Sequence, residues 1–126
     1  MERHLNIRSL VGTPYNFPSH PPHTFDCWSL VKYVRGLKGL ECPLPFSDAE
    51  EWCMPVNMVP AIAMARESWT TMDEPVDFCM AVMERSHVGV VLDDGVLHAL
   101  ARNSTVVWTP MRAIHTRWPK TEWWNA

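Results

Sequence analysis

The sequence predicts an α+β fold in which helices occupy the first half of the chain and an antiparallel β-sheet the second. Apolar residues recur at helical spacing in the first half, whereas short apolar runs separated by turn signals fill the second. Helices and strands that are segregated along the chain in this way are typical of α+β domains. The chain has 126 residues, which suits a single domain, residues 1–126.

Composition narrows the class of protein. The hydrophobic fraction of 47% and the charged fraction of 20% are those of a globular chain. The net charge of −3 and the lack of a basic block give nucleic-acid binding no electrostatic support. No apolar run approaches the length of a transmembrane helix, and no secretory signal follows Met1. We therefore expect no membrane partner, synthesis in a cytoplasm, and reduced cysteines instead of two disulfides.

The chain before the first long helix is predicted to be mostly turn and loop. Prolines interrupt residues 1–24 repeatedly, and only residues 7–11 are expected to form a short helix or strand. A second helix is predicted later, over residues 56–69. Pro60 is compatible with that helix if it lies in the first turn.

The first long helix is predicted over residues 26–38. Asp26 is a good N-cap residue, because its carboxylate accepts from the free backbone N–H groups of the first turn. The apolar face follows the spacing i, i+3, i+4 and i+7 and comprises Cys27, Leu30, Val31 and Val34. The cations are predicted to lie off that face, namely Lys32, Arg35 and Lys38. Gly39 ends the helix.

Five short strands are predicted after Pro75, with a loop at residues 70–75 before them. The strands are expected at residues 76–83, 87–92, 96–100, 105–109 and near 122–124. Asp93-Asp94-Gly95 is predicted to be a hairpin turn, because an Asp-Gly pair tolerates the positive φ that such turns require. The strands then form an antiparallel meander.

Cys27 is the candidate nucleophile. A thiol at the N-terminus of a helix is close to the positive end of the helix dipole, which is expected to lower its pKa and raise the thiolate fraction. We would then expect Cys27 to alkylate faster near neutral pH than the other three cysteines. The alternative is that Cys27 is a small core hydrophobe, as free cysteines often are.

His87 and His98 complete a candidate catalytic triad. They lie on the two strands of the predicted hairpin, and the alternation along each strand can direct both rings to one face of the sheet. A helix packed on that face would bring Cys27 to His87. Thiol, imidazole and an orienting group are the nucleophile, base and orienter of cysteine acyl transfer. His98 would fix the tautomer of His87, so its loss should cost rate more than stability. Taken singly, His87 is better explained as a hydrogen-bonded residue at a strand end, and His98 as a half-buried residue of the sheet.

These motifs resemble the NlpC-type family of cell-wall cysteine peptidases. The resemblance rests on Gly12-Thr13-Pro14-Tyr15, Phe25-Asp26-Cys27-Trp28-Ser29-Leu30-Val31, His87-Val88-Gly89-Val90-Val91-Leu92 and Leu97-His98-Ala99. It implies a papain-like fold with Cys27 as nucleophile, His87 as base and His98 as third member. It also implies that Tyr15 and the backbone N–H of Cys27 hold the oxyanion. Asp26 and Trp28 are assigned to the oxyanion and substrate side of the site.

The resemblance also implies a substrate and a setting. The family mostly cleaves peptidoglycan stem peptides, commonly between D-glutamate and the diamino acid, and no metal or organic cofactor is implied. Trp28 and Ser29 stand where the family usually has Ser and Gly. A tryptophan there is similar to versions in phage tail-tip proteins and gene-transfer particles, which open the wall during DNA entry. The expected partners are the stem peptide and other phage tail proteins, and the expected place of action is the cell wall, after synthesis in the bacterial cytoplasm.

One departure and three alternatives remain. The family often has a Gly-Gly step between the tyrosine and the cysteine, whereas residues 16–24 contain no glycine, so a differently shaped groove is expected. The first alternative is that the chain is a non-catalytic tail-assembly or wall-binding module. The second is that it is an interbacterial amidase effector. A structural zinc site is the third alternative, with ligands drawn from His20, His23, Cys27 and either Cys42 or Cys53.

Overall fold

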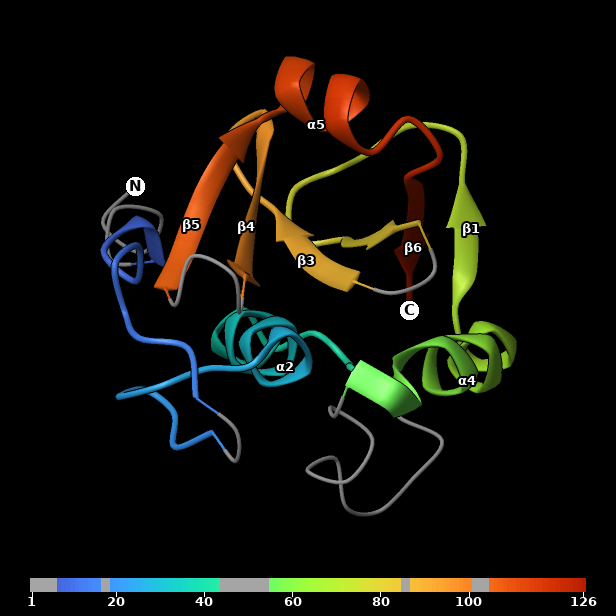
Figure 1. The fold of residues 1–126 in the computed structure, drawn as a ribbon. Coiled ribbons are helices and arrows are strands. Elements are labelled where there is room, and N and C mark those ends of the chain that lie inside the picture. The colour runs from blue at the N-terminus through green and yellow to red at the C-terminus, as the bar shows by residue number, and fades with distance from the viewer. Residues whose placement is uncertain (1–6, 17–18, 44–54, 85–86, 101–104) are drawn as a thin grey trace.

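The computed structural model describes residues 7–16, 19–43, 55–84, 87–100 and 105–126, and it has the predicted α+β architecture (Figure 1). Within these ranges two helices precede all six strands, and a third helix lies between the last two strands. The helices are α2 (Cys27–Leu37), α4 (Pro55–Ala65) and α5 (Met111–Arg117), with a 3₁₀ turn η1 (Arg66–Ser68). The strands are β1 (Thr70–Met72), β2 (Met80–Met83), β3 (His87–Val91), β4 (Gly95–Leu100), β5 (Thr105–Pro110) and β6 (Glu122–Asn125).

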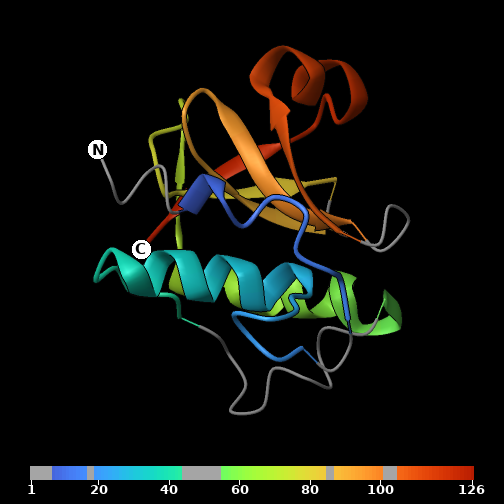
Figure 2. The ribbon, with the colours of Figure 1, turned by 90° about the vertical axis from the view of Figure 1, so that its left-hand side faces the viewer.

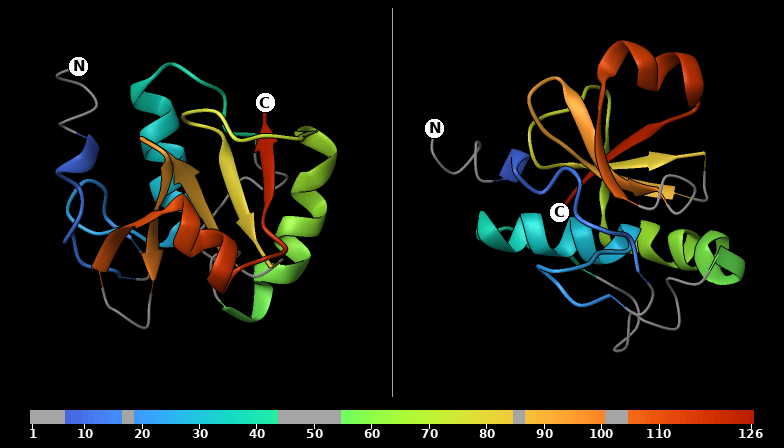
Figure 3. Two further views of the ribbon diagram at one scale, coloured as in Figure 1. Left: turned by 90° about the horizontal axis from the view of Figure 1, so that it is seen from above. Right: turned by 60° about the vertical axis from the view of Figure 1, so that its left-hand side comes forward.

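The strands form one six-stranded antiparallel sheet with the order β1-β6-β2-β3-β4-β5. Strands β2 to β5 are the predicted meander. The last strand, β6, returns to pair with β2, and β1 pairs with the outer edge of β6. Helices α2 and α4 cover one face of the sheet and α5 covers the other (Figures 2 and 3).

Two apolar clusters hold these layers together, one on each face of the sheet. Side chains alternate between the faces along a strand. The cluster beneath α2 and α4 includes Trp28, Leu30, Val31 and Val34 of the helix and Val88, Val90, Leu97 and Ala99 of the strands. The cluster beneath α5 includes Ala81, Met83, Val91, Val96, Met111 and Ile114. Neighbouring strand residues therefore belong to opposite layers.

Helix α2 begins as predicted, with Asp26 as its N-cap. Oδ1 of Asp26 accepts from the backbone N–H of Ser29 at 2.9 Å, and Oγ of Ser29 accepts from the backbone N–H of Asp26 at 2.9 Å. This reciprocal pair is a capping box, which satisfies two backbone donors that a helix end otherwise leaves free. Gly39, with a φ of +69°, follows the last turn as expected.

The prediction for Arg35 is wrong, because its side chain is fully buried. Arg35 lies eight residues after Cys27, so two turns of helix place it on the same face. Its Nε donates to the carbonyl of Glu41 and its Nη1 to the carbonyl of Phe78, both at 2.6 Å. These bonds connect the end of α2 to the segment that follows it and to the segment before β2. The charge of Arg35 alone does not predict this role.

The predicted hairpin between β3 and β4 is present, but the special backbone geometry lies on different residues. Asp93 and Asp94 have φ values of 51° and 59°, whereas Gly95 already belongs to β4. Leu92 and Gly95 exchange both backbone hydrogen bonds, at 2.9 and 3.1 Å. A two-residue loop with positive φ at both positions matches the twist of the flanking strands. Gly95 is required for another reason, since a Cβ there would lie 2.4 Å from Cε2 of Trp108.

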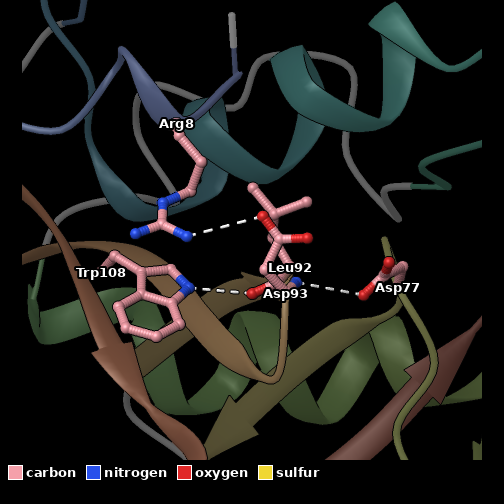
Figure 4. Close-up of polar contacts among 5 residues, drawn as sticks. All are labelled: Arg8, Asp77, Leu92, Asp93 and Trp108. Atoms are coloured by element: carbon pink, nitrogen blue, oxygen red, sulfur yellow. Dashed lines mark hydrogen bonds and ion pairs between the residues drawn. The ribbon is translucent and has the colours of Figure 1, made fainter. Parts of the chain in front are cut away.

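Side chains from three other segments hold this turn in place (Figure 4). Nε1 of Trp108 donates to the carbonyl of Leu92 at 2.8 Å, and Oδ1 of Asp77 accepts from the backbone N–H of Asp93 at 3.2 Å. The guanidinium of Arg8 lies 4.3 Å from the centre of the Trp108 ring and 3.5 Å from Oδ2 of Asp93. Asp93 is therefore a structural turn residue, as its position predicted.

Several element boundaries differ from the prediction. Residues 70–72 form β1 and not a loop, because Thr71 pairs with Trp124 at the edge of the sheet. The second strand begins at Met80 and not at residue 76. Helix α4 begins at Pro55, so Pro60 is its sixth residue and lies beyond the first turn.

Helix α5 and the segment near the N-terminus also differ from the prediction. Helix α5 was not predicted at all, and of residues 7–11 only Ile7 and Arg8 are helical. Among the residues that the structure describes, no helix has the length and apolar character needed to cross a membrane.

Candidate active site

Cys27 is the first residue of α2, and its thiol reaches the beginning of β3. The sulfur accepts from the backbone N–H of Val88, in addition to the N–H groups of Cys27 itself and Trp28 at the helix end. Val88 follows His87 directly. The structure therefore brings the predicted nucleophile to the end of the strand that carries the predicted base. The Cys27 residue is only 6% exposed.

A local opening of the sheet makes this contact possible. The N–H of Val91 donates to the carbonyl of Cys79 on the β2 side of β3. Because N–H groups alternate along a strand, that of Val88 points to the β4 side. The pairing of β4 with β3 covers only Val90↔Leu97 and Val91↔Val96, whereas β4 pairs with β5 along its whole length. The N–H of Val88 is thus free of the ladder and available to the thiol.

This geometry corrects the expected packing of the helix. We expected α2 to cover the face that carries both histidines. Instead α2 packs against the face of Val88 and Val90, and alternation directs His87 and His98 toward the α5 layer. The thiol meets the level of His87 at the end of the strand, where β3 and β4 separate, and not across the middle of a sheet face.

The two histidines meet as predicted, and they are part of a longer chain. Nε2 of His87 lies 3.0 Å from Nδ1 of His98, within hydrogen-bonding distance. Nε2 of His98 lies 2.9 Å from Oγ1 of Thr109 on β5. Continuing the register past Val90↔Leu97 places His98 opposite Gly89, so the two imidazoles are diagonal neighbours. His98 is fully buried and Thr109 is 9% exposed.

Trp118, directly after α5, packs against His98 in this series of hydrogen-bonded side chains. Its ring lies edge-on to His98, with centroids 5.5 Å apart and planes at 88°. The guanidinium of Arg117 lies 4.6 Å from the centre of the Trp118 ring. Sequence reasoning singled out neither Thr109 nor Trp118. The strand register holds a signal for Thr109, since it pairs with Val96, two residues before His98.

Burial decides the protonation of all three groups. Desolvation by burial, followed by the charge of Asp26, raises the pKa of Cys27 to about 12, although three backbone N–H groups oppose the rise. Burial lowers the pKa of His87 to about 4. Burial, then His87 and Arg117, lowers the pKa of His98 to about 3. The expected lowering of the Cys27 pKa is therefore wrong, and near pH 7 the site holds a neutral thiol and neutral imidazoles.

The other predicted site residues have different surroundings. Tyr15 is half-buried and forms a parallel bridge with Phe25, two residues before the thiol. Asp26 is 2% exposed and its carboxylate caps α2, so it acts on the thiol through its charge. Trp28 is fully buried in the core beneath α2, so its side chain does not line a substrate groove.

The zinc alternative receives no support from the part of the chain that the structure describes. There, no group of three or more His, Cys, Asp or Glu side chains is close enough to hold a metal ion. His20 and His23 are exposed, whereas Cys27 is buried. Among the described residues, Cys27, Cys42 and Cys79 form no disulfide bond. Cys53, the other proposed ligand, lies outside the described residues.

Comparison with known proteins adds no further evidence for this chain. No protein-family model matches the sequence, and no curated protein matches it significantly.

Proposed function

We propose that the chain is a cysteine peptidase with a papain-like, NlpC-type fold. The observation that carries the proposal is the hydrogen bond from the backbone N–H of Val88 to the sulfur of Cys27, at the start of the strand that begins with His87. The 3.0 Å contact of His87 with His98 supplies the orienting group. A nucleophile, a base and an orienter on a helix N-terminus and two adjacent strands are the parts that cysteine acyl transfer needs.

In this proposal His87 acts as a general base. Its Nε2 is engaged by His98, so Nδ1 is the nitrogen that takes the thiol proton. As that proton leaves, the sulfur lone pair attacks the carbonyl carbon of the scissile amide and the carbonyl oxygen becomes negative. Collapse of this intermediate breaks the C–N bond, and the imidazolium returns the proton to the departing amine. Water, deprotonated by the same imidazole, then hydrolyses the thioester and regenerates the thiol.

The pKa values of Cys27 and His87 describe the resting pair and make proton transfer between the two groups unfavourable before substrate binds. With a pKa of about 4, His87 is neutral near pH 7 and able to accept a proton. With a Cys27 pKa of about 12, the proton stays on sulfur until the substrate is attacked. The pair thus begins as thiol and imidazole and forms charge only during the reaction, when the N–H groups of Cys27, Trp28 and Val88, which donate to the sulfur, stabilise negative charge on that atom.

The proposed substrate is a peptidoglycan stem peptide, cleaved between D-glutamate and the diamino acid, in a phage tail-associated wall hydrolase. This part rests on the resemblance of the motifs around Tyr15, Cys27, His87 and His98. The near-complete burial of Cys27, at 6% exposed, favours one competing function, a wall-binding module without turnover. An experiment on the wall itself separates the two.

The test is a digest of purified peptidoglycan analysed by mass spectrometry. The wild-type protein is expected to release stem-peptide fragments with a new amino terminus on the diamino acid, and Cys27→Ala is expected to release none. Cys42→Ala is the matched control, since it removes a half-buried thiol elsewhere and should retain activity. Equal release by wild type and Cys27→Ala would exclude Cys27 as nucleophile. Binding of peptidoglycan without release by either would favour the wall-binding module.

A further inference from the structure

We infer that Thr109 is a positioning residue that fixes the proton arrangement of the two active-site histidines, an inference that rests on the proposed function. The hydroxyl of Thr109 ends a chain of hydrogen bonds that begins at His87 and passes through the fully buried His98. Because each neutral imidazole has one donor and one acceptor nitrogen, the role of the hydroxyl sets the roles of all four ring nitrogens.

The chain has two possible directions, and only one serves a general base. If Oγ1 of Thr109 accepts, His98 carries its proton on Nε2 and accepts from His87 at Nδ1. His87 then carries its proton on Nε2, and its Nδ1 has a free lone pair for the thiol proton. If Thr109 donates, both protons move to the opposite nitrogens and Nδ1 of His87 is already protonated. We infer that Thr109 accepts, because only this direction leaves Nδ1 of His87 unprotonated for the proposed reaction.

The surroundings of His98 make the hydroxyl decisive. The imidazole is fully buried and Trp118 lies edge-on to its ring, with centroids 5.5 Å apart. A buried ring nitrogen has no solvent to replace a lost partner, so an N–H at Nε2 depends on Oγ1 of Thr109 at 2.9 Å. Removal of the oxygen leaves that N–H buried without its acceptor and favours the other tautomer.

Two matched variants separate this positioning role from packing. Thr109→Val keeps the shape of the side chain and removes the oxygen, and Thr109→Ser keeps the oxygen and removes a methyl group. Thr116→Val is the control, since Thr116 is exposed on α5 and its hydroxyl donates to the carbonyl of Arg112. Each protein is labelled with ¹⁵N in its histidines, and NMR at pH 7 reports which nitrogen of each ring is protonated.

The expected wild-type spectrum shows His98 and His87 protonated on Nε2. Thr109→Val is expected to lose that pattern at His98 and to slow alkylation of Cys27 by iodoacetamide about ten- to hundredfold, the range that a lost hydrogen bond to a buried group corresponds to. Thr109→Ser is expected to restore both, and Thr116→Val to change neither.

Several results overturn the inference. Protonation of His98 on Nδ1 in the wild-type protein would overturn it without any variant, even if Thr109→Val fails to fold. A Thr109→Val protein with the wild-type tautomers and alkylation rate also does so, as does a Thr109→Ser protein that restores neither. The tautomer measurement needs no substrate. If it succeeds while Cys27→Ala retains full peptidase activity, the proposed function fails and the assignment of Thr109 stands.

Discussion

A Cβ built on Gly89 would lie 2.9 Å from the Cβ of His98. It would also lie 2.6 Å from Cγ1 of Val96. Both distances are shorter than packed carbon atoms allow. The absence of a side chain at Gly89 therefore lets β4 approach β3 closely enough for His98 to reach the diagonal position, where its Nδ1 meets Nε2 of His87 at 3.0 Å.

Gly89→Ala adds only one methyl group but is expected to lower both the stability and the activity of the protein. The added methyl group must push β4 away, with a loss of about 1–3 kcal/mol in the free energy of unfolding, as overpacked sites show. The same shift separates the imidazoles, so the proposed peptidase activity should fall further than the stability. Denaturant unfolding and the peptidoglycan digest measure the two effects. Gly36→Ala is the control, because Gly36 lies in α2 with open space around its Cβ position. This variant should gain about 0.5–1 kcal/mol in the free energy of unfolding. Full activity in Gly89→Ala would contradict the argument.

Asp26→Asn is expected to lower the pKa of Cys27 without loosening the helix. The charge of Asp26 is the second cause, after burial, that raises this pKa to about 12. Asparagine keeps the oxygen that accepts from the N–H of Ser29, so the cap is retained. Titration of the thiolate by ultraviolet absorbance measures the shift, and thermal unfolding measures the cap.

The matched control is Asp26→Ala, which removes charge and cap together. It should show the same fall in the Cys27 pKa and also lose about 1 kcal/mol of stability. An unchanged Cys27 pKa in both variants would mean that Asp26 does not act on the thiol.

His98→Ala is expected to cost stability as well as rate, which revises the expectation from sequence alone. His98 is fully buried, is hydrogen-bonded at both ring nitrogens and packs against Trp118. Alanine leaves a cavity and removes the partner of His87 Nε2, at a cost of about 2–4 kcal/mol. His98→Gln, which refills much of the volume, should recover part of the stability. Urea unfolding of the two variants measures these changes in stability. An unchanged midpoint for His98→Ala would mean that His98 does not stabilise the core.

The features that the sequence predicted correctly are those with local causes. Asp26 caps α2 because its carboxylate reaches the N–H of Ser29, and this depends only on four consecutive residues. The parity that brings His87 and His98 together follows from the two-residue turn and the period of a strand. Both are visible in a linear sequence.

The features that were missed depend on contacts between distant segments. β1 is a strand only because β6, some 50 positions later, supplies its partner. The pKa of Cys27 follows from burial by layers that the helix alone does not reveal. Thr109 contacts His98 because β5 lies beside β4. Arg35 is buried because the carbonyls of Glu41 and Phe78 accept hydrogen bonds from its guanidinium. Local patterns do not contain these relationships.

Acid is expected to destabilise the protein through protonation of His87 and His98. Their folded-state pKa values are about 4 for His87 and about 3 for His98, below the usual 6.5. Between these values the unfolded chain binds more protons than the folded one, so the free energy of unfolding falls as the pH falls. The contribution is fully present above about pH 6.5. Going from pH 7 to pH 4 should remove on the order of 3 kcal/mol for each histidine.

Urea unfolding at several pH values between 7 and 4 measures this loss, and a histidine variant assigns it. His87→Gln removes one titrating ring near the end of β3, so the loss of stability over that range should shrink by about 3 kcal/mol. His23→Gln removes an exposed histidine and should leave the pH dependence unchanged. If His87→Gln retains the full loss, His87 does not contribute to acid unfolding and is solvated enough in the folded state to titrate normally.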